Sequence, residues 1–223
     1  MATVNKNYDK LQGVYLFSEI AKRTKDFMTK NPGVEIIKLG IGDTTRPLTK
    51  TVIQGLKEGV KKLGNAKTYT GYVDAQGDVR LRTALVNFYK EKNIVLDLKE
   101  IFISDGAKSD SANIQSIFGS DNIVAIMDPA YTVYLDSNVI AGRTGEFKNG
   151  KYEGLVYMDC NKENNFLPSI PKTKTDIIYL CSPNNPTGAV FTKEHLKDFV
   201  DYALKNKAVI IFDAAYAEYI SDK

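Results

Sequence analysis

Apolar residues recur at two different spacings along this chain, and the spacing changes at about residue 95. Before that point the spacing is helical, because apolar side chains repeat every three or four positions over residues 52–63, and Gly64-Asn65 ends the segment. A second stretch of the same kind covers residues 78–92. We therefore predict a helix-rich region with one short strand up to about residue 95.

Beyond residue 100, short uninterrupted apolar runs alternate with helical patterns. The runs cover residues 101–104, 123–127, 176–181 and 208–212, and an apolar helical stripe over residues 196–204 separates the last two. Short apolar strands separated by helices are typical of a mostly parallel sheet with helices on both faces. The pattern therefore predicts an α/β fold.

The composition is that of an ordinary globular protein, with 43% hydrophobic and 26% charged residues. Lysine and arginine number 30 against 27 acidic residues, which gives a net charge of only +3. Basic and acidic residues are interspersed, whereas a nucleic-acid binder more often shows a concentrated basic face. We therefore expect no nucleic-acid partner.

Residues 1–10 are polar and lack the apolar core of a signal peptide. No apolar run approaches the roughly 20 residues of a membrane helix, so we expect a cytoplasmic protein without a membrane partner. His195, the only histidine, lies in a charged stretch where we expect it to be solvated. Cys160 and Cys181 lack a CxxC spacing. We expect reduced thiols and no metal site.

Polar clusters follow the four apolar runs, at the strand ends where open parallel sheets bind their ligands. After the first run, residues 104–109 read Ser-Asp-Gly-Ala-Lys-Ser and lead into a predicted helix. Glycine lets the backbone approach a ligand, and the free amides of a helix N-terminus attract phosphate. The same pattern is typical of a turn that only caps a helix, so it leaves both interpretations open.

The other three clusters contain candidate ligand groups. Tyr131 follows Pro129 at the start of a helix, where its ring could stack on a flat cofactor or pack in an ordinary interface. Residues 181–188 have the composition of a turn, but they directly follow a buried strand, so the Asn185 amide could donate to a ligand oxygen. Asp213 ends the last run, where a buried carboxylate is costly unless a cation pairs with it.

Taken together and in this order, the clusters resemble the fold-type I pyridoxal-phosphate (PLP) aminotransferases of class I/II. Hallmarks of that family are an Asn-Pro-x-Gly turn and a following Asp-x-x-Tyr, here Asn185-Pro186-Thr187-Gly188 and Asp213-Ala214-Ala215-Tyr216. Within the family, the chain is most similar to the LL-diaminopimelate aminotransferases. The resembling stretches are residues 13–20, 38–48, 69–72 with 76–77, 102–108 and 182–188.

The resemblance implies a fold and an assembly. Residues 46–223 would form an incomplete PLP-binding large domain, with a mostly parallel sheet and helices on both faces. Residues 1–45 would form an N-terminal arm and a segment of the small domain. The full-length parent would be a homodimer whose two active sites share residues.

The resemblance also assigns roles around the cofactor ring. Asp213 would pair with the pyridine nitrogen of PLP and keep it protonated, which preserves the ring as an electron sink. Asn185 and Tyr216 would hydrogen-bond the 3′ oxygen of the ring, and Tyr131 would stack on its face.

Other residues match the phosphate and the substrate. The phosphate would lie against the backbone of Ala107 and against Lys108, with Ser109 as a weaker match, and against Tyr72 of the partner subunit. An acidic residue near Tyr72 is expected to bind the distal ammonium of the substrate, and Asp74 is the candidate here. The remaining substrate-binding candidates are Tyr15, Gly42, Lys108, Tyr131 and Asn185.

The Schiff-base lysine of the family lies in a Ser-x-Ser-Lys stretch after the Asp-x-x-Tyr motif, and we expect it beyond Lys223. The implied reaction interconverts LL-diaminopimelate plus 2-oxoglutarate and tetrahydrodipicolinate plus glutamate, which serves lysine and peptidoglycan precursor synthesis. Without that lysine, residues 1–223 alone are expected not to transaminate. Two alternatives stay open: a class I aminotransferase for aspartate or aromatic amino acids, and a non-catalytic module that retains part of a PLP pocket.

Overall fold

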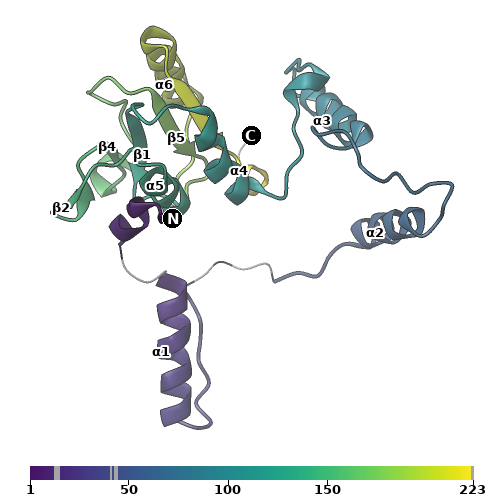
Figure 1. Cartoon of the computed structure of the whole chain (residues 1–223), viewed down its shortest axis with the longest axis horizontal. Helices are drawn as coiled ribbons and strands as arrows, with labels where there is room; N and C mark the ends of the chain where they lie inside the picture. The colour runs from purple at the N-terminus through teal and green to yellow at the C-terminus, as the bar shows by residue number, and fades with distance from the viewer. Residues whose placement is uncertain (13–15, 41, 43–44, 222–223) are drawn as a thin grey trace. The chain divides into compact units, whose positions relative to one another are not determined.

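The structure is a computed structural model that describes residues 1–12, 16–40, 42 and 45–221 (Figure 1). Its helices are α1 (Leu16–Lys30), α2 (Lys50–Leu63), α3 (Val79–Glu91), α4 (Ala107–Asn113), α5 (Thr132–Ile140) and α6 (Lys193–Asn206). Its strands are β1 (Val124–Asp128), β2 (Phe147–Lys148), β3 (Lys151–Tyr152), β4 (Leu155–Asp159), β5 (Ile177–Cys181) and β6 (Val209–Asp213). Short 3-10 turns are η1 (Lys6–Lys10), η2 (Leu98–Glu100), η3 (Ile114–Ile117), η4 (Lys162–Asn164) and η5 (Ala217–Tyr219).

The chain divides into two compact units. Unit 1 consists of Met1–Gln12 and Ser104–Lys223, and unit 2 consists of Gly13–Ile103. Unit 1 contains the described strands together with α4, α5 and α6, whereas unit 2 contains α1, α2 and α3. The helix-rich character predicted for the first part of the chain is therefore confirmed. The short strand predicted there is not found among the described residues of unit 2.

Four parallel strands form the main sheet of unit 1, in the order β4-β1-β5-β6. The register pairs Asp128 at the end of β1 with Asp159 at the end of β4, and Cys181 at the end of β5 with Asp213 at the end of β6. All four strands therefore end at one edge of the sheet. This arrangement confirms the predicted α/β class with a parallel sheet.

Both faces of the sheet are covered at its centre. Every residue of β5 is buried, and β1 is buried up to Met127. Because side chains alternate between the faces of a strand, uninterrupted burial requires packing on both. The ring of Tyr134 in α5 stacks on Tyr179 of β5, with 4.9 Å between the ring centroids. Phe199 of α6 belongs to the same apolar core, and Figure 1 shows both helices alongside the strands.

The predicted strand over residues 101–104 is wrong. This segment has no strand structure, and Phe102 is exposed. A backbone hydrogen bond of 2.9 Å from Ile103 to Gln76 joins it to the preceding turn, in place of a strand ladder. Gly77 permits this close approach, because its φ is +101° and a Cβ there would lie 2.5 Å from the Cβ of Ile103.

The edge strand β6 also departs from the prediction. Its uninterrupted apolar run is typical of a buried central strand, yet Val209 and Phe212 are exposed. Among the described residues, β6 pairs with β5 on one side only. The apolar pattern of β6 therefore marks a surface that the described part of the chain leaves uncovered.

The two longest helical predictions agree closely with the structure. Thr49 caps α2 by accepting from Val52 N, and Asp78 caps α3 by accepting from Arg80 N, so side-chain oxygens satisfy amides that have no partner within the helix. No helix in the described part of the chain is long and apolar enough to cross a membrane.

Candidate functional site

The strand order places a topological switch point between β1 and β5. The chain passes from β1 to β4 on one side and then returns to β5 on the other side of β1. In open α/β sheets, ligands bind in the crevice outside the carboxyl ends of the strands at such a point. Two loops leave the sheet there, residues 129–131 after β1 and residues 182–188 after β5. Both hold residues that the sequence singled out.

Asn184 joins these two loops. Its side chain is only 3% exposed, and its Nδ2 donates to the carbonyl of Pro129 at 3.3 Å and to the hydroxyl of Thr187 at 3.0 Å. The amide of Gly188 donates to the carbonyl of Asn184 at 2.7 Å and closes the turn. The turn composition of residues 182–188 therefore builds one fixed loop that is attached to the turn before Tyr131.

Asp213 lies at the same edge, at the end of β6. Its Oδ2 accepts a hydrogen bond from the Tyr134 hydroxyl at 2.6 Å, and its Oδ1 accepts from the amide of Ala215 at 2.9 Å. Neither donor carries a charge. The structure thus fixes the carboxylate at a strand end without neutralising it, and a carboxylate with two oxygens retains lone pairs for a further donor.

Tyr134 is a permanent donor in this arrangement. Its side chain is 2% exposed, and burial, followed by the hydrogen bond to Asp213, raises the pKa of Tyr134 far above its ordinary value of 10. The hydroxyl therefore stays protonated, and able to donate, at neutral and mildly alkaline pH. A hydrogen bond to an ionised acceptor is stronger than one between neutral groups.

The three other ring-side candidates leave the sheet at the same edge. Tyr131 is half-buried and directs its ring edge-on to Tyr134, with 5.7 Å between centroids. Asn185 is half-buried, and its side chain makes no hydrogen bond to another described residue. Tyr216 follows β6 and is exposed. The structure therefore brings Tyr131, Asn185, Asp213 and Tyr216 to one edge of one sheet.

The phosphate candidates begin α4, which lies against β6. Ala107 and Lys108 are the first two residues of this helix and are exposed. Gly106 caps it with φ at 141°, a backbone conformation that favours glycine. The hydroxyl of Tyr179 in β5 donates to the carbonyl of Ser111 at 3.4 Å, which attaches α4 to the sheet.

A lysine lies between the ends of β1 and β4. Lys151 Nζ is 2.8 Å from Asp128 and 3.6 Å from Asp159, and it lies 4.6 Å from the centroid of the Tyr157 ring. The hydrogen bond to Asp128 raises the pKa of Lys151. The strand-end aspartates of β1 and β4 are therefore neutralised by a protein cation, whereas Asp213 is not.

The remaining site candidates belong to unit 2. Tyr72 is fully exposed, and Gly42 is exposed with open space around its Cα. Asp74 already has a partner, because its Oδ2 lies 3.3 Å from the guanidinium of buried Arg82 and its Oδ1 accepts from Gln76 N at 2.8 Å. A substrate ammonium would have to compete with Arg82 for this carboxylate. Tyr15 lies outside the described residues.

Two residues of the site were not assigned from the sequence. Tyr134 stands three positions after Tyr131, a spacing that places both on one face of a helix, and that spacing is the signal that could have identified it. Asn184 had no such signal, because its neighbour Asn185 has the same chemistry and only the fold shows which of them is buried.

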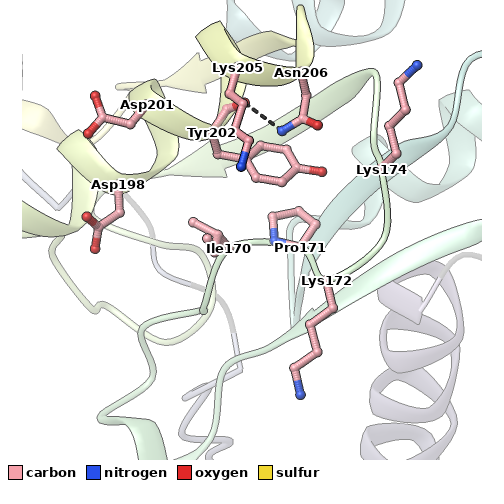
Figure 2. A pocket seen from close by; sticks show the side chains of 9 residues that line it. All are labelled: Ile170, Pro171, Lys172, Lys174, Asp198, Asp201, Tyr202, Lys205 and Asn206. Carbon is pink, nitrogen blue, oxygen red and sulfur yellow. Dashed lines mark hydrogen bonds between the residues drawn. The ribbon is translucent and has the colours of Figure 1, made fainter.

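A separate hollow lies at the opposite edge of the sheet, between the loop that leads into β5 and the end of α6. It has a volume of about 490 Å³, and Figure 2 shows the ring of Tyr202 beside Pro171 within it. The Tyr202 hydroxyl is already bonded to the carbonyl of Thr173 at 2.8 Å. The side chains of Lys172 and Lys174 point in opposite directions in Figure 2, so they do not converge on one ligand.

Comparison with known proteins identifies the family of this chain. The family described as aminotransferase class I and II matches residues 34–223. This chain belongs to that family. It is 53% identical over its whole length to an LL-diaminopimelate aminotransferase of Desulfotalea psychrophila, and 51% identical over 97% of its length to one of Methanosphaera stadtmanae.

A solved structure extends the likeness to the fold. The L,L-diaminopimelate aminotransferase of Chlamydomonas reinhardtii superposes with a TM-score of 0.90 at 44% identity over 99% of this chain. The chain spans about half the length of these relatives: 55% and 53% of the two sequences and 54% of the solved chain. The resemblance to the LL-diaminopimelate aminotransferases is therefore confirmed for this portion of their length.

Proposed function

We propose that residues 1–223 act as the N-terminal part of a PLP-dependent aminotransferase that interconverts LL-diaminopimelate plus 2-oxoglutarate and tetrahydrodipicolinate plus glutamate. The observation that carries this proposal is the identity of about half of all residues, along the entire chain, with proteins named for that substrate. The Schiff-base lysine of the parent protein lies, in this proposal, beyond Lys223.

The donor set at the switch point fits PLP. A protonated pyridine nitrogen is a cationic donor, and Asp213 offers an anionic acceptor whose two protein partners are both neutral. When bound, PLP supplies an electron sink for the negative charge that develops at the substrate Cα. Asp213 serves that chemistry by keeping a negative charge fixed opposite the ring nitrogen.

Three further residues would complete the ring contacts. Asn185 would donate its side-chain amide, which has no hydrogen-bond partner among the described residues, to the 3′ oxygen. Tyr216 would donate to the same oxygen, and Tyr131 would cover the ring face. The rigid 182–188 loop, fixed by Asn184, would hold Asn185 in place while the substrate exchanges.

The phosphate and substrate assignments rest on position. Ala107 and Lys108 at the start of α4 would bind the phosphate, together with Tyr72 of a second copy, and the exposure of Tyr72 agrees with a role outside its own subunit. Gly42 and Tyr15 would lie at the substrate entrance. Asp74 stays the candidate for the distal ammonium, in competition with its ion pair to Arg82.

The direct test uses a protein of family length that carries residues 1–223 as its N-terminal part. Turnover with LL-diaminopimelate and 2-oxoglutarate, and the reverse with glutamate and tetrahydrodipicolinate, is the expected result. Turnover only with aspartate or aromatic amino acids would overturn the substrate assignment. Failure to bind PLP at all would support the non-catalytic alternative.

A matched pair of variants separates the site from the rest of the sheet edge. Asp213→Asn should lower turnover by roughly two to three orders of magnitude, because it removes a preorganised charge in the active site. Asp159→Asn changes another strand-end aspartate, one that pairs with Lys151, and should leave turnover within about twofold of wild type. Equal losses in the two variants would contradict the assigned role of Asp213.

A further inference from the structure

Tyr134 reaches the site because two elements bring it there. It is the third residue of α5, and its amide donates to the carbonyl of Tyr131 at 3.2 Å in the first turn. On β5 and β6 the register aligns Cys181 with Asp213, so the Asp213 side chain lies on the sheet face that also carries Tyr179. The stacking of Tyr134 on Tyr179 places its ring on that same face.

Each oxygen of Asp213 then has one donor. The Tyr134 hydroxyl lies 2.6 Å from Oδ2, and the Ala215 amide lies 2.9 Å from Oδ1. With both oxygens bound, the carboxylate cannot rotate without breaking a hydrogen bond. The plane of the carboxylate, and hence the direction of its remaining lone pairs, is set by these two donors.

The second tyrosine of the stack shows what a purely structural hydroxyl does here. Tyr179 is 1% exposed and its hydroxyl donates to a backbone carbonyl, that of Ser111, at 3.4 Å. A buried tyrosine needs some partner, and a backbone carbonyl is an ordinary one. Tyr134 has instead a short bond to the carboxylate that ends β6, across 79 residues of sequence.

Building on the proposed function, we propose that Tyr134 is a positioning residue: its hydroxyl holds Asp213 in the orientation that receives the pyridine nitrogen of the cofactor. Tyr134 acts only through Asp213 and contacts neither substrate nor reacting atoms. Burial and the carboxylate keep the hydroxyl protonated, so it donates over the whole working pH range of the enzyme.

The test measures binding of two ligands to the family-length protein: PLP, and the analogue in which a C–H group replaces the ring nitrogen. Tyr134→Phe keeps the ring that stacks on Tyr179 and removes only the hydroxyl. It should weaken PLP binding by about tenfold, the effect of one charge-assisted hydrogen bond. The affinity for the analogue should stay within about twofold of the wild-type value, because its C–H group donates no hydrogen bond to Asp213.

Two further variants make the result specific. Tyr179→Phe removes the other hydroxyl of the same stack, and it should leave the ratio of the two affinities at the wild-type value. In an Asp213→Asn background, Tyr134→Phe should cause no further change in that ratio, since the hydroxyl would have no carboxylate to orient. Thermal unfolding and near-UV circular dichroism of each variant report whether the fold is retained.

The possible outcomes are distinct. Equal loss of both ligands in Tyr134→Phe, or no loss of either, would overturn the positioning role and leave the proposed function intact. A wild-type protein that binds the analogue as tightly as PLP would instead refute the pairing of Asp213 with the ring nitrogen, on which both proposals rest.

Discussion

The two units of this chain bury their apolar residues to very different extents. In unit 1, β1 and β5 and the inner faces of α5 and α6 enclose a continuous apolar core. In unit 2, only Arg82 and Ile101 are buried among the described residues, and α2 has no buried residue at all. The sequence pattern of α2 is nevertheless as amphipathic as any in the chain, with Val52, Leu56 and Val60 exposed along it.

The difference teaches that an apolar stripe predicts a helix but does not identify what the helix packs against. Most helical stability in proteins comes from packing of the apolar face, and short isolated helices are marginal in water. Unit 1 contains its own packing partners, because each of its helices returns to the sheet. We infer that the apolar face of α2 is covered in the family-length protein.

The largest expected effect comes from paired leucine truncations in residues 1–223. Leu180 in β5 is 1% exposed, so Leu180→Ala should lower the free energy of unfolding by about 2–5 kcal/mol. Leu56 in α2 is 58% exposed, and Leu56→Ala should change it by no more than about 0.5 kcal/mol. Amide exchange in increasing urea measures both costs, followed in β5 for Leu180→Ala and in α2 for Leu56→Ala.

The same two leucine substitutions, made in the family-length protein, test whether the apolar face of α2 is covered there. If the face of α2 is covered there, the cost of Leu56→Ala should rise to about 2 kcal/mol or more. A cost that stays below about 0.5 kcal/mol in the longer protein would show that this face remains solvent-exposed.

Each unit also has one buried arginine, and these form the second test. Arg143 in unit 1 donates to Gln115 and to the carbonyls of Phe118 and Gly119, so Arg143→Ala should cost about 3 kcal/mol by leaving buried acceptors unpaired. Arg82 in unit 2 bonds Gln76 and half-exposed Asp74, so Arg82→Ala should cost about 1–2 kcal/mol. Thermal unfolding monitored by circular dichroism measures both costs, with exposed Arg80→Ala as a near-neutral control. A larger cost for Arg82→Ala than for Arg143→Ala would contradict this order.

A smaller effect is the pH dependence of the stability of unit 1. Burial raises the pKa of the Cys160 thiol from 9 to about 11, so the unfolded chain ionises this thiol first as the pH rises. The resulting stabilisation is complete below about pH 8.5 and is lost as the pH rises toward 11. It amounts to about 2–3 kcal/mol.

Urea unfolding of wild type and Cys160→Ala at neutral and alkaline pH measures this contribution. The stability difference between the two proteins should shrink by about 2 kcal/mol over that interval. A difference that is independent of pH would mean that the thiol ionises as readily in the folded protein as in the unfolded chain.

Local signals predicted the elements that depend on local interactions. Apolar spacing, with Gly64-Asn65 at the end of the first helix, gave the positions of α2 and α3 to within a few residues, and the apolar runs gave β1, β5 and β6. The hairpin of β2 and β3 was missed although its Asn149-Gly150 turn, with φ of 52° and 83°, is a strong hairpin signal. β4 was missed although residues 155–158 read Leu-Val-Tyr-Met, a short apolar run of the same kind as the others.

The features that the sequence did not predict depend on contacts between elements that are distant in the sequence. Residues 101–104 have strand-like residues but no strand beside them in the described structure, and a ladder requires a neighbour. Asp213 was predicted from its place at a strand end, whereas its partner Tyr134 depends on α5 folding back over β5. The ion pair of Asp74 with Arg82 likewise follows from the packing of α3 against the turn before it.

Whether Asp213 receives a protonated ring nitrogen can be measured at the nitrogen itself. The family-length protein is loaded with PLP labelled with nitrogen-15 at the ring position, and the nitrogen resonance is recorded at neutral and mildly alkaline pH for wild type and for Asp213→Asn. We expect a protonated nitrogen in wild type and an unprotonated one in the variant. An unprotonated nitrogen in wild type, or the same protonated signal in both proteins, would contradict it.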